Sequence, residues 1–439
     1  MATHTQLGFI DEEKRNLSTT SFEKDQGTGT ALENIEKSAE RAYVRKLDFY
    51  LLPFLSLMYF FNSVDRSNLG NAKTDGMDKD LGFKGEQYSL LILLFYIPNG
   101  LCDLPLNMLT KKWSGRVMLP TLMVGWGAMA LFQCAAKNFA GMLVIRLLLG
   151  GFEAGFFAGT MTVIIALIAY AWLPAAPQSA WFLNEAERKV AERRTLRDLS
   201  SSTSHDFNLK ECFKEWSNWK MVPWCIIAFT YPVAFSTTSN FLPQIVQRLG
   251  YSVVKTNLWT VAPNAVGFVI LLCVTYSSDH FRERTFHIVF SLCVSLVGLI
   301  ILASIDILAN KGVAYFACFM LAAGAYIPSC LFHSWHNNNN LNENARAATT
   351  GLLVGLGNLG GIVSAATFRQ EYAPKYIPTL AATAACNATC IIFTLCLGGW
   401  MKLDNRRRNK QQCVKIRAEE VRTSELGDGE RSEMWRYFT

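Results

Sequence analysis

Two residues of opposite charge stand within one long apolar stretch, where a charged side chain is costly and marks a candidate site. Arg146 and Glu153 are seven positions apart within residues 139–173. Seven residues make two helical turns, so both side chains would leave nearly the same face, roughly 10 Å apart along the axis. A guanidinium binds a carboxylate through paired hydrogen bonds, and a carboxyl group removed from water holds its proton towards neutral pH. We therefore expect Arg146 to bind an organic anion and Glu153 to exchange a proton; a structural ion-pair network is the alternative.

Other polar residues lie in or beside apolar stretches. Asp65 and Arg66 end the first stretch, where they would either take part in the same chemistry or cap a helix as an interfacial pair. Asn358 lies in a glycine-rich segment and would hydrogen-bond a polar substrate, unless the segment serves helix packing alone. His333 and Trp335 end another stretch; a proton relay through His333 is the minor alternative to an aromatic belt at the membrane surface.

Positioning these residues requires helices that cross a bilayer. Of the 439 residues, 51% are hydrophobic and 18% are charged, whereas a soluble domain averages about 25% charged residues. Stretches of about 20 apolar residues fit membrane-spanning helices. We expect ten spans, near residues 48–64, 87–109, 117–136, 139–173, 222–246, 258–277, 285–305, 312–335, 346–368 and 378–401. The predicted fold class is all-α: a polytopic membrane helical bundle with four spans before a polar linker and six after it.

The positions of Lys and Arg predict the orientation, because loops rich in these residues stay in the cytosol. With the N-terminus inside, the basic loop at 111–116, the linker and the basic C-terminal tail all fall on the cytosolic side. The protein is expected to be an integral protein of the plasma membrane with both termini cytosolic. The predicted organisation is a disordered tail (1–44), an N-terminal transmembrane half (45–174), a cytosolic linker (175–220), a C-terminal transmembrane half (221–402) and a cytosolic tail (403–439).

Composition and motifs argue against several function classes. The twelve cysteines stand mostly inside apolar runs without a CxxC pair, which is typical of buried small hydrophobes. No basic patch interleaved with aromatics indicates nucleic-acid binding, and no GxxxxGK[ST] motif indicates nucleotide binding. No HExxH or nucleophile–base pair indicates an enzyme. We expect no cofactor or metal; the expected partners are the lipid bilayer, a small organic anion and protons.

The stretch 139–173 is too long for one ordinary span. As one helix its 35 residues would reach roughly 50 Å, against about 30 Å of hydrocarbon. It carries no loop residues, and two crossings would place the basic linker outside the cell. We therefore expect one long helix, bent or tilted near Gly150, Gly151, Gly155 and Gly159.

Five motifs stand in a fixed order along the chain. They are DRSNLGNAK at 65–73, PLN at 105–107 with KKWSGR at 111–116, RLLLG at 146–150 with EAG at 153–155, SDHFRER at 278–284, and GNLGG at 357–361. Together they resemble the major facilitator superfamily, and within it the fungal anion:cation symporters (the allantoate, nicotinate and pantothenate permease group). The resemblance covers about residues 42–410.

This resemblance implies two halves around a midplane cavity, and transport that is driven by gradients and not by ATP. Asp65 and Glu153 match acidic positions that are candidates for proton coupling in the superfamily, and Arg66 and Arg146 match basic positions near the substrate. Charged residues of two loops look like the gating motif, although positive-inside topology would also explain them. They are Asp103, Lys111, Lys112 and Arg116 in the first half and Asp279, Arg282 and Arg284 in the second.

The sequence departs from the family pattern of six spans, a linker and six spans. The fourth span continues after Phe157 into what looks like the end of a sixth, with the join near residues 160–163. About two spans are therefore expected to be missing. The expected function is secondary transport, by proton symport, of a small organic anion such as a carboxylate nutrient or vitamin. The main alternative is a transport-inactive variant, possibly a sensor; an intramembrane enzyme and a seven-span receptor fit less well.

Overall fold

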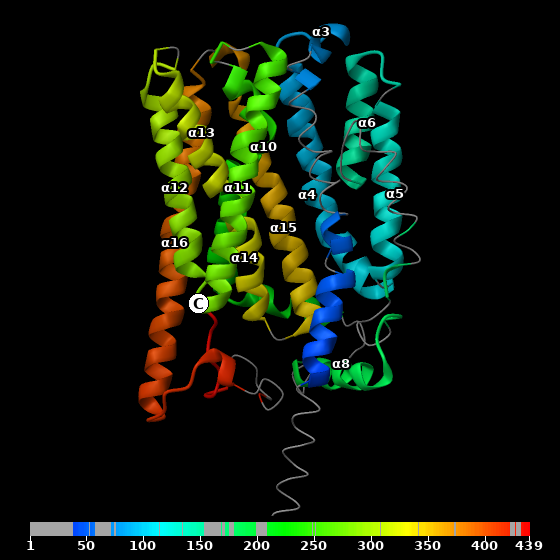
Figure 1. The fold of residues 1–439 in the computed structure, drawn as a ribbon, viewed down its shortest axis with the longest axis vertical. Helices are drawn as coiled ribbons and strands as arrows, with labels where there is room; N and C mark the ends of the chain where they lie inside the picture. Colours follow the sequence, from blue (N-terminus) through cyan, green and yellow to red (C-terminus); the bar gives the residue numbers. More distant parts are fainter. Residues whose placement is uncertain are drawn as a thin grey trace, which may run out of the picture. The chain divides into compact units, whose positions relative to one another are not determined.

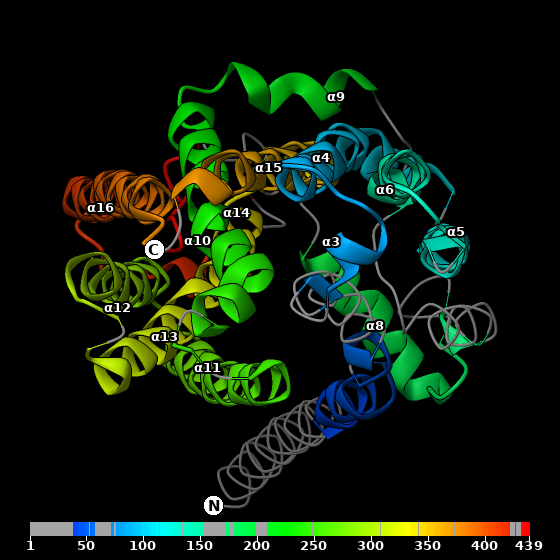
Figure 2. The same cartoon turned by 90° about the horizontal axis from the view of Figure 1, so that it is seen from above.

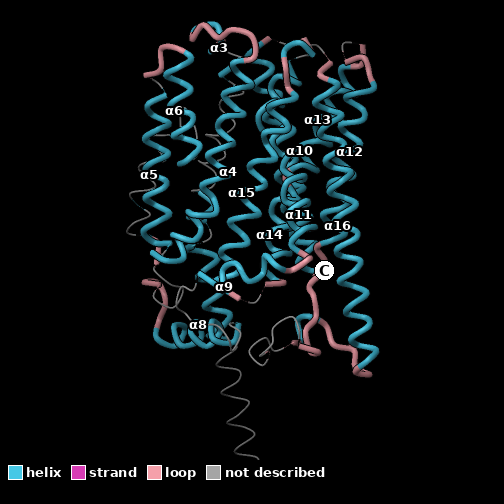
Figure 3. The backbone as a smooth tube through the Cα atoms, turned by 180° about the vertical axis from the view of Figure 1, so that it is seen from behind, coloured by secondary structure: helices cyan, strands magenta, loops and turns pink. Residues whose placement is uncertain are grey.

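The computed structural model is helical, and its helices are joined by loops. It describes residues 38–51, 53–57, 72–73, 76–113, 115–133, 135–152, 168, 172–174, 180–198, 209–247, 249–250, 252–307, 309–340, 342–372, 375–421, 426 and 432–439. Within these ranges there is no strand (Figure 3). The chain divides into two compact units: Met1–Ser56 with Leu173–Leu196, and Leu57–Trp172 with Arg197–Thr439.

The larger unit contains the long helices (Figure 1). They are α4 (Gln87–Trp113), α5 (Gly115–Gln133), α6 (Phe139–Phe152), α10 (Met221–Gln247), α11 (Val253–Phe281), α12 (Thr285–Ser304), α13 (Lys311–Ala325), α14 (Ile327–Asn338), α15 (Glu343–Thr367) and α16 (Ile377–Gln411). Shorter elements are α3 (Met77–Asp80), α9 (Leu209–Lys214) and the 3-10 turns η3 (Glu215–Ser217), η4 (Gln370–Tyr372) and η5 (Ala418–Glu420).

Seven spans of the described chain are long and apolar enough to cross a membrane. They are Gln87–Thr110, Met221–Ser239, Val254–Phe281, Thr285–Ser304, Lys311–Asn338, Asn344–Thr367 and Ile377–Gln411, and each coincides with a predicted span. The predicted span 117–136 forms α5, and α6 forms the start of 139–173. Residues 153–167, with the expected bend at Gly155 and Gly159, lie outside the described residues, as do residues 52 and 58–64 of the predicted span 48–64.

The smaller unit joins a helix at 38–46, which η1 (Leu47–Leu51) continues, to α8 (Glu185–Asp198) in the predicted linker. Glu187, the third residue of α8, forms a capping box with Asn184: its backbone N–H donates to Asn184 Oδ1 (2.8 Å), and its carboxylate accepts from the Asn184 N–H (2.9 Å). The same carboxylate accepts a hydrogen bond from Lys46 Nζ at 2.8 Å. Beside this ion pair, Tyr43 packs in a small apolar core with Leu183.

In the larger unit, α15 lies against α4 so closely that the two backbones touch. A Cβ on Gly355 would stand 2.4 Å from the carbonyl oxygen of Gly100, and one on Gly100 would stand 2.6 Å from Leu359 Cγ. One turn earlier on α15, Gly351 faces the backbone of Leu104. Glycines at such a spacing let two membrane helices approach to backbone contact.

The opposite side of α15 makes the same kind of contact with α10. A Cβ on Gly360 would stand 2.2 Å from the Phe229 carbonyl oxygen, and Gly357 faces Pro232. Figure 2 shows α15 with α4 on one side and α10 on the other. Because α4 precedes the linker and α10 follows it, α15 joins the two predicted halves.

The span Lys311–Asn338 is broken in its middle. Helix α13 ends at Ala325 and α14 begins at Ile327, with Pro328 in its first turn. Tyr326 stands at the break, and its hydroxyl donates to Asn264 Oδ1 of α11 at 2.9 Å. Proline lacks the N–H that would continue the helical ladder, so the break follows from the sequence.

Replacement of Gly355 by alanine should destabilise the protein, because the added methyl group would meet the Gly100 backbone. Overpacking of this kind costs about 1–3 kcal/mol. The matched control is Gly399→Ala in α16, where nothing lies within 4 Å of an added Cβ. Thermal unfolding of the detergent-solubilised protein should show a lower midpoint for Gly355→Ala and an unchanged or higher one for Gly399→Ala. Equal midpoints would contradict the close approach.

The Glu187 carboxyl should titrate below its usual range. Burial raises the pKa of this group, but hydrogen bonds from Lys46 and the Asn184 backbone, with the Lys46 charge, outweigh it and lower the pKa below 4.5. Because the folded pKa is lowered, the stabilisation is present above about pH 4.5 and is lost as pH falls through the folded pKa. Carbon-13 NMR of labelled glutamates should give a midpoint below 4.5 for Glu187. In Lys46→Ala the midpoint should rise; an unchanged midpoint would contradict the ion pair.

Candidate functional site

One face of α4 carries a row of polar side chains along the contact with α10 and α15. Tyr88, Tyr96, Asn99 and Asp103 are separated by eight, three and four positions, so they share a helical face. Their partners are Ser236 and Gln244 of α10 and Asn358 of α15. We call these seven residues the polar seam.

Asp103 and Asn358, two predicted site residues far apart in the sequence, meet in this seam. The Asn358 amide Nδ2 donates to Asp103 Oδ2 at 2.5 Å and also lies 3.4 Å from Asn99 Oδ1. Asp103 had been expected to accompany the basic loop residues, and Asn358 to bind substrate. The structure adds a carboxylate–amide hydrogen bond between the predicted halves, beside the Gly100–Gly355 backbone contact.

The rest of the seam links α4 to α10. The hydroxyls of Tyr96 and Ser236 are 2.7 Å apart, and Gln244 Nε2 donates to the Tyr88 hydroxyl at 3.3 Å. Lys73 Nζ lies 3.4 Å from Gln244 Oε1 and 3.9 Å from the centroid of the Tyr88 ring. The seam therefore ends in a cation held against an aromatic ring and an amide oxygen.

Arg146 is buried on α6, with 3% of its surface exposed. Its guanidinium carbon lies 5.9 Å from the centroid of the Phe95 ring on α4. Phe95 directly precedes Tyr96 of the polar seam, so the two side chains leave α4 about 100° apart around its axis. An enclosed guanidinium beside an aromatic ring is a suitable group for binding an anion inside a membrane.

The second predicted gate forms at the turn between α11 and α12. The Arg284 guanidinium forms an ion pair with Asp279 and donates to the Ser278 hydroxyl at 3.2 Å. Arg282 takes the left-handed conformation (φ 55°) that ends α11. Glu283, which sequence reasoning gave no role, binds Lys402 of α16 at 2.7 Å. Its carboxylate also accepts the Phe286 N–H at 2.7 Å, so it caps α12.

The remaining predicted site residues are not brought together within the described chain. Lys112 and Arg116, around the turn from α4 to α5, are exposed, and the side chain of Lys111 lies outside the described residues. Asp65, Arg66 and Glu153 also lie outside them.

The aromatic-belt interpretation of Trp335 is wrong, because this side chain is completely buried among other rings of α10 and α14. Its ring centroid lies 4.5 Å from that of Trp224. His333 faces α10 as well, where its Nε2 is 3.0 Å from the Tyr231 hydroxyl. The Trp335 and His333 side chains therefore pack against α10 and not at a membrane surface.

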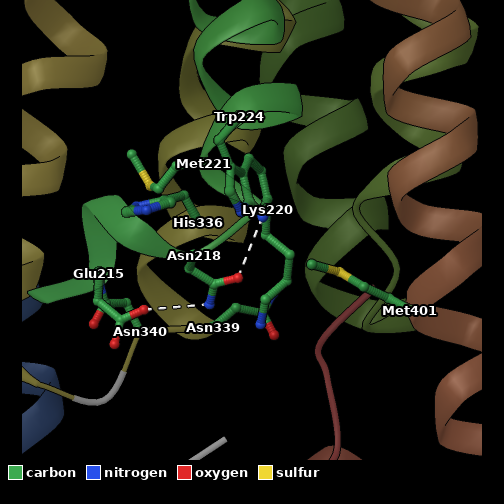
Figure 4. Close-up of a pocket in the computed structure, with 9 residues that line it drawn as sticks. All are labelled: Glu215, Asn218, Lys220, Met221, Trp224, His336, Asn339, Asn340 and Met401. Atoms are coloured by element: carbon green, nitrogen blue, oxygen red, sulfur yellow. Dashed lines mark hydrogen bonds between the residues drawn. The ribbon is translucent and has the colours of Figure 1, made fainter.

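A pocket lies where α10 begins and α14 ends (Figure 4). Its lining residues are Glu215, Asn218, Lys220, Met221, Trp224, His336, Asn339, Asn340 and Met401. None of them is a predicted site residue, and the pocket is apart from the polar seam. In the part of the chain that the structure describes, no three His, Cys, Asp or Glu side chains are grouped to hold a metal ion.

The Major Facilitator Superfamily model matches residues 55–168 and 156–365 of this chain. The chain belongs to the major facilitator superfamily. The Emericella nidulans "Major facilitator-type transporter hxnP" is 53% identical over 92% of this chain and 94% of its own length. The Hormonema carpetanum "MFS-type transporter efuF" is 45% identical over 90% of this chain and 91% of its own length. The fold resembles the crystal structure of a bacterial homologue of the human lysosomal transporter Spinster (TM-score 0.52, 14% identity, 80% of this chain, 97% of the other).

These relatives and this fold make the protein a membrane transporter of the secondary type, not an enzyme. The alignment with hxnP also includes positions that have no residue in this chain. The hxnP alignment runs over 466 positions, whereas 92% of this 439-residue chain is about 404 residues, so about 62 aligned positions have no residue here. The two segments that match the family model overlap at residues 156–168, a range that includes the expected join. Two spans of about 20 residues each with their loops would need a length of this order.

Asp103 and Asn358 should be energetically coupled, because their hydrogen bond joins α4 to α15. Interhelical hydrogen bonds in membranes contribute about 0.6 kcal/mol and at most about 1.7. The Asp103→Ala and Asn358→Ala single and double variants form a double-mutant cycle for the free energy of unfolding in detergent. We expect a coupling energy in this range. A matched cycle of Asp103→Ala with Asn257→Ala, on α11, should give none.

Proposed function

We propose that the protein is a proton-coupled symporter of a small organic anion, and that Arg146 binds the anion. The observation that carries this proposal is the burial of Arg146 on α6, beside the Phe95 ring. A charged side chain at the centre of a membrane helix costs about 2.5–3.5 kcal/mol on insertion scales, so such residues mark substrate or ion paths. A carboxylate substrate would recover this cost by binding the guanidinium through two hydrogen bonds.

Proton coupling is assigned to Asp65 and Glu153. Glu153 follows directly after the last residue of α6, seven positions from Arg146. A carboxyl group beside a bound anion gains a proton more readily, because the neutral form avoids repulsion between like charges. Proton uptake at Glu153 and anion binding at Arg146 would then favour each other.

The polar seam is proposed to close one entrance to the site. Its hydrogen bonds, Asp103–Asn358 and Tyr96–Ser236, join helices of the two halves. Rocking one half against the other would break these bonds as α4 moves away from α10 and α15. Arg66 and Asn358 would contact the substrate when the seam opens. We place the protein in the plasma membrane with both termini in the cytosol, as its basic residues predict.

A transport-inactive variant is the second candidate, and the gap of about 62 aligned positions favours it. Helices that are absent would leave polar groups of their neighbours facing lipid, which is unfavourable. Such a chain would still bind an anion at Arg146 if it acts as a sensor, but it would not move the anion.

Uptake of labelled carboxylates into transporter-deficient yeast tests both candidates. The wild-type chain should show saturable uptake that rises at acidic external pH, and Arg146→Ala should reduce it at least tenfold. Arg146→Lys should restore only part, since lysine cannot form the paired hydrogen bonds. Arg369→Ala, a side chain that is half exposed, is the matched control and should leave uptake unchanged.

Two outcomes would overturn the symporter proposal. One is uptake that survives Arg146→Ala; the other is no uptake by a chain that reaches the membrane. In the second case, a chain with the missing positions of hxnP inserted between residues 156 and 168 should regain uptake if the gap is the reason. Anion binding by the purified chain, lost in Arg146→Ala, would then support the sensor.

A further inference from the structure

Residues Ser432–Thr439 form a turn followed by a short segment without secondary structure, and they pack on the end of the bundle where α11 and α12 meet. The residues Trp435, Arg436 and Tyr437 are 1%, 1% and 4% exposed. Trp435 and Tyr437 belong to the same apolar cluster as Trp224 and Trp335.

Two asparagines hold the backbone of this segment. Asn405 of α16 donates its Nδ2 to the Tyr437 carbonyl and accepts the Tyr437 N–H, both at 2.8 Å. Asn339, after α14, pairs with Phe438 in the same way, with both distances 2.9 Å. The indole N–H of Trp335 also donates to the Phe438 carbonyl at 2.9 Å. Paired hydrogen bonds from an amide to both main-chain groups of one residue are the way a docking site recognises an extended peptide.

Arg436 gives the segment its side-chain specificity. Its Nε donates to Asn409 Oδ1 and its Nη2 to Gln412 Oε1, both at 2.7 Å, and both acceptors lie at the end of α16. Nearby, Arg408 donates to the Ser432 carbonyl at 2.7 Å. The guanidinium of Arg436 is thus bound by neutral oxygens of a helix that extends about 52 Å for its 35 residues, longer than a bilayer core.

The same segment reaches the second predicted gate. The backbone N–H of Arg284 donates to a Thr439 oxygen at 2.7 Å, one residue from the Glu283–Lys402 ion pair. At the start of α10, Lys220 Nζ donates to the Tyr437 hydroxyl at 3.2 Å. Ser432–Thr439 therefore contacts α10, the α11–α12 turn, α16 and the end of α14. The contact with the Arg284 N–H places the segment directly on the turn that carries the Asp279–Arg284 ion pair.

We propose that the ends of α10, α14 and α16 form a peptide-docking site, that its occupant is the chain's own Ser432–Thr439, and that the docked segment is a releasable latch on the α11–α12 turn. Docking restrains Arg284 and Glu283, and release frees them. The contacts to the backbone of Tyr437 and Phe438 come from neutral side chains near helix ends, so the segment can leave without unfolding a helix. The proposal does not depend on the identity of the transported substrate.

Hydrogen exchange of the full chain in detergent tests the latch. The variant is Asn339→Ala with Asn405→Ala, which removes both backbone pairs. We expect the amides of residues 282–286 and 435–438 to exchange at least tenfold faster, while those of α15 keep their protection. The control is Asn138→Ala with Asn310→Ala, two exposed asparagines whose side-chain hydrogen bonds are local to other loops, and it should leave both regions unchanged.

The outcomes separate a latch from a structural support. Unchanged exchange at residues 282–286 would overturn the coupling to the turn. Loss of protection in α15 together with the turn would show that the segment is part of one folding unit and would also overturn the latch. A synthetic peptide of residues 432–439 added to a Trp435→Ala variant should restore protection of Arg284; failure to do so would overturn the docking site.

Uptake gives an independent readout. A released latch should change the uptake rate at least twofold, with α15 protection unchanged. If neither wild type nor variant takes up any anion, the proposed transport function fails, whereas the exchange measurements still decide the latch. An unchanged uptake rate in a transporting chain whose segment is released would overturn the regulatory part of the proposal.

Discussion

The backbone contact between α4 and α15 determines where the polar side chains of the two halves can meet. At Gly100 and Gly355 the helices touch without side chains between them. Only at such a distance can the short side chains of Asp103 and Asn358 form a hydrogen bond at 2.5 Å. Because Gly360 presses against α10 from the other side, α15 has little freedom to move alone. The polar seam and its glycines thus act together, because the close helix packing keeps the hydrogen-bonding side chains within reach of one another.

The charged residues at two kinds of site in this protein are stabilised in different ways. Arg146 is enclosed beside an aromatic ring within the span, whereas Asp279, Glu283 and Arg284 lie at the end of helices where carboxylates and cations neutralise one another. The first arrangement suits a group that receives a charged partner from solution. The second suits contacts that form and break as helix ends move, because water can solvate the separated ions.

Long apolar stretches made most of the helices predictable from the sequence, since helix formation is the only way for a single segment to satisfy its backbone in lipid. Other features could not be predicted in this way. The partners of α4 depend on which helix of the second half lies beside it; the spacing of Tyr88, Tyr96, Asn99 and Asp103 is the sequence signal for its polar face, which was not predicted. Pro328 is the signal for the break at Tyr326, whereas 312–335 was predicted as one span. The docking of Trp435 and Arg436 left no local signal, because its partners Asn339, Asn405 and Asn409 are scattered polar residues whose roles arise only in three dimensions.

The contact between Gly100 and Gly355 also constrains how this sequence can diverge. The two positions are separated by more than half of the gene, yet neither can gain a side chain unless the other helix withdraws. Changes on α4 and α15 must therefore be inherited together, and a gap in the helices between them leaves this pair intact. A chimera that joins the first half of this chain to the second half of a relative would inherit a working seam only if both parents keep small residues at these two places.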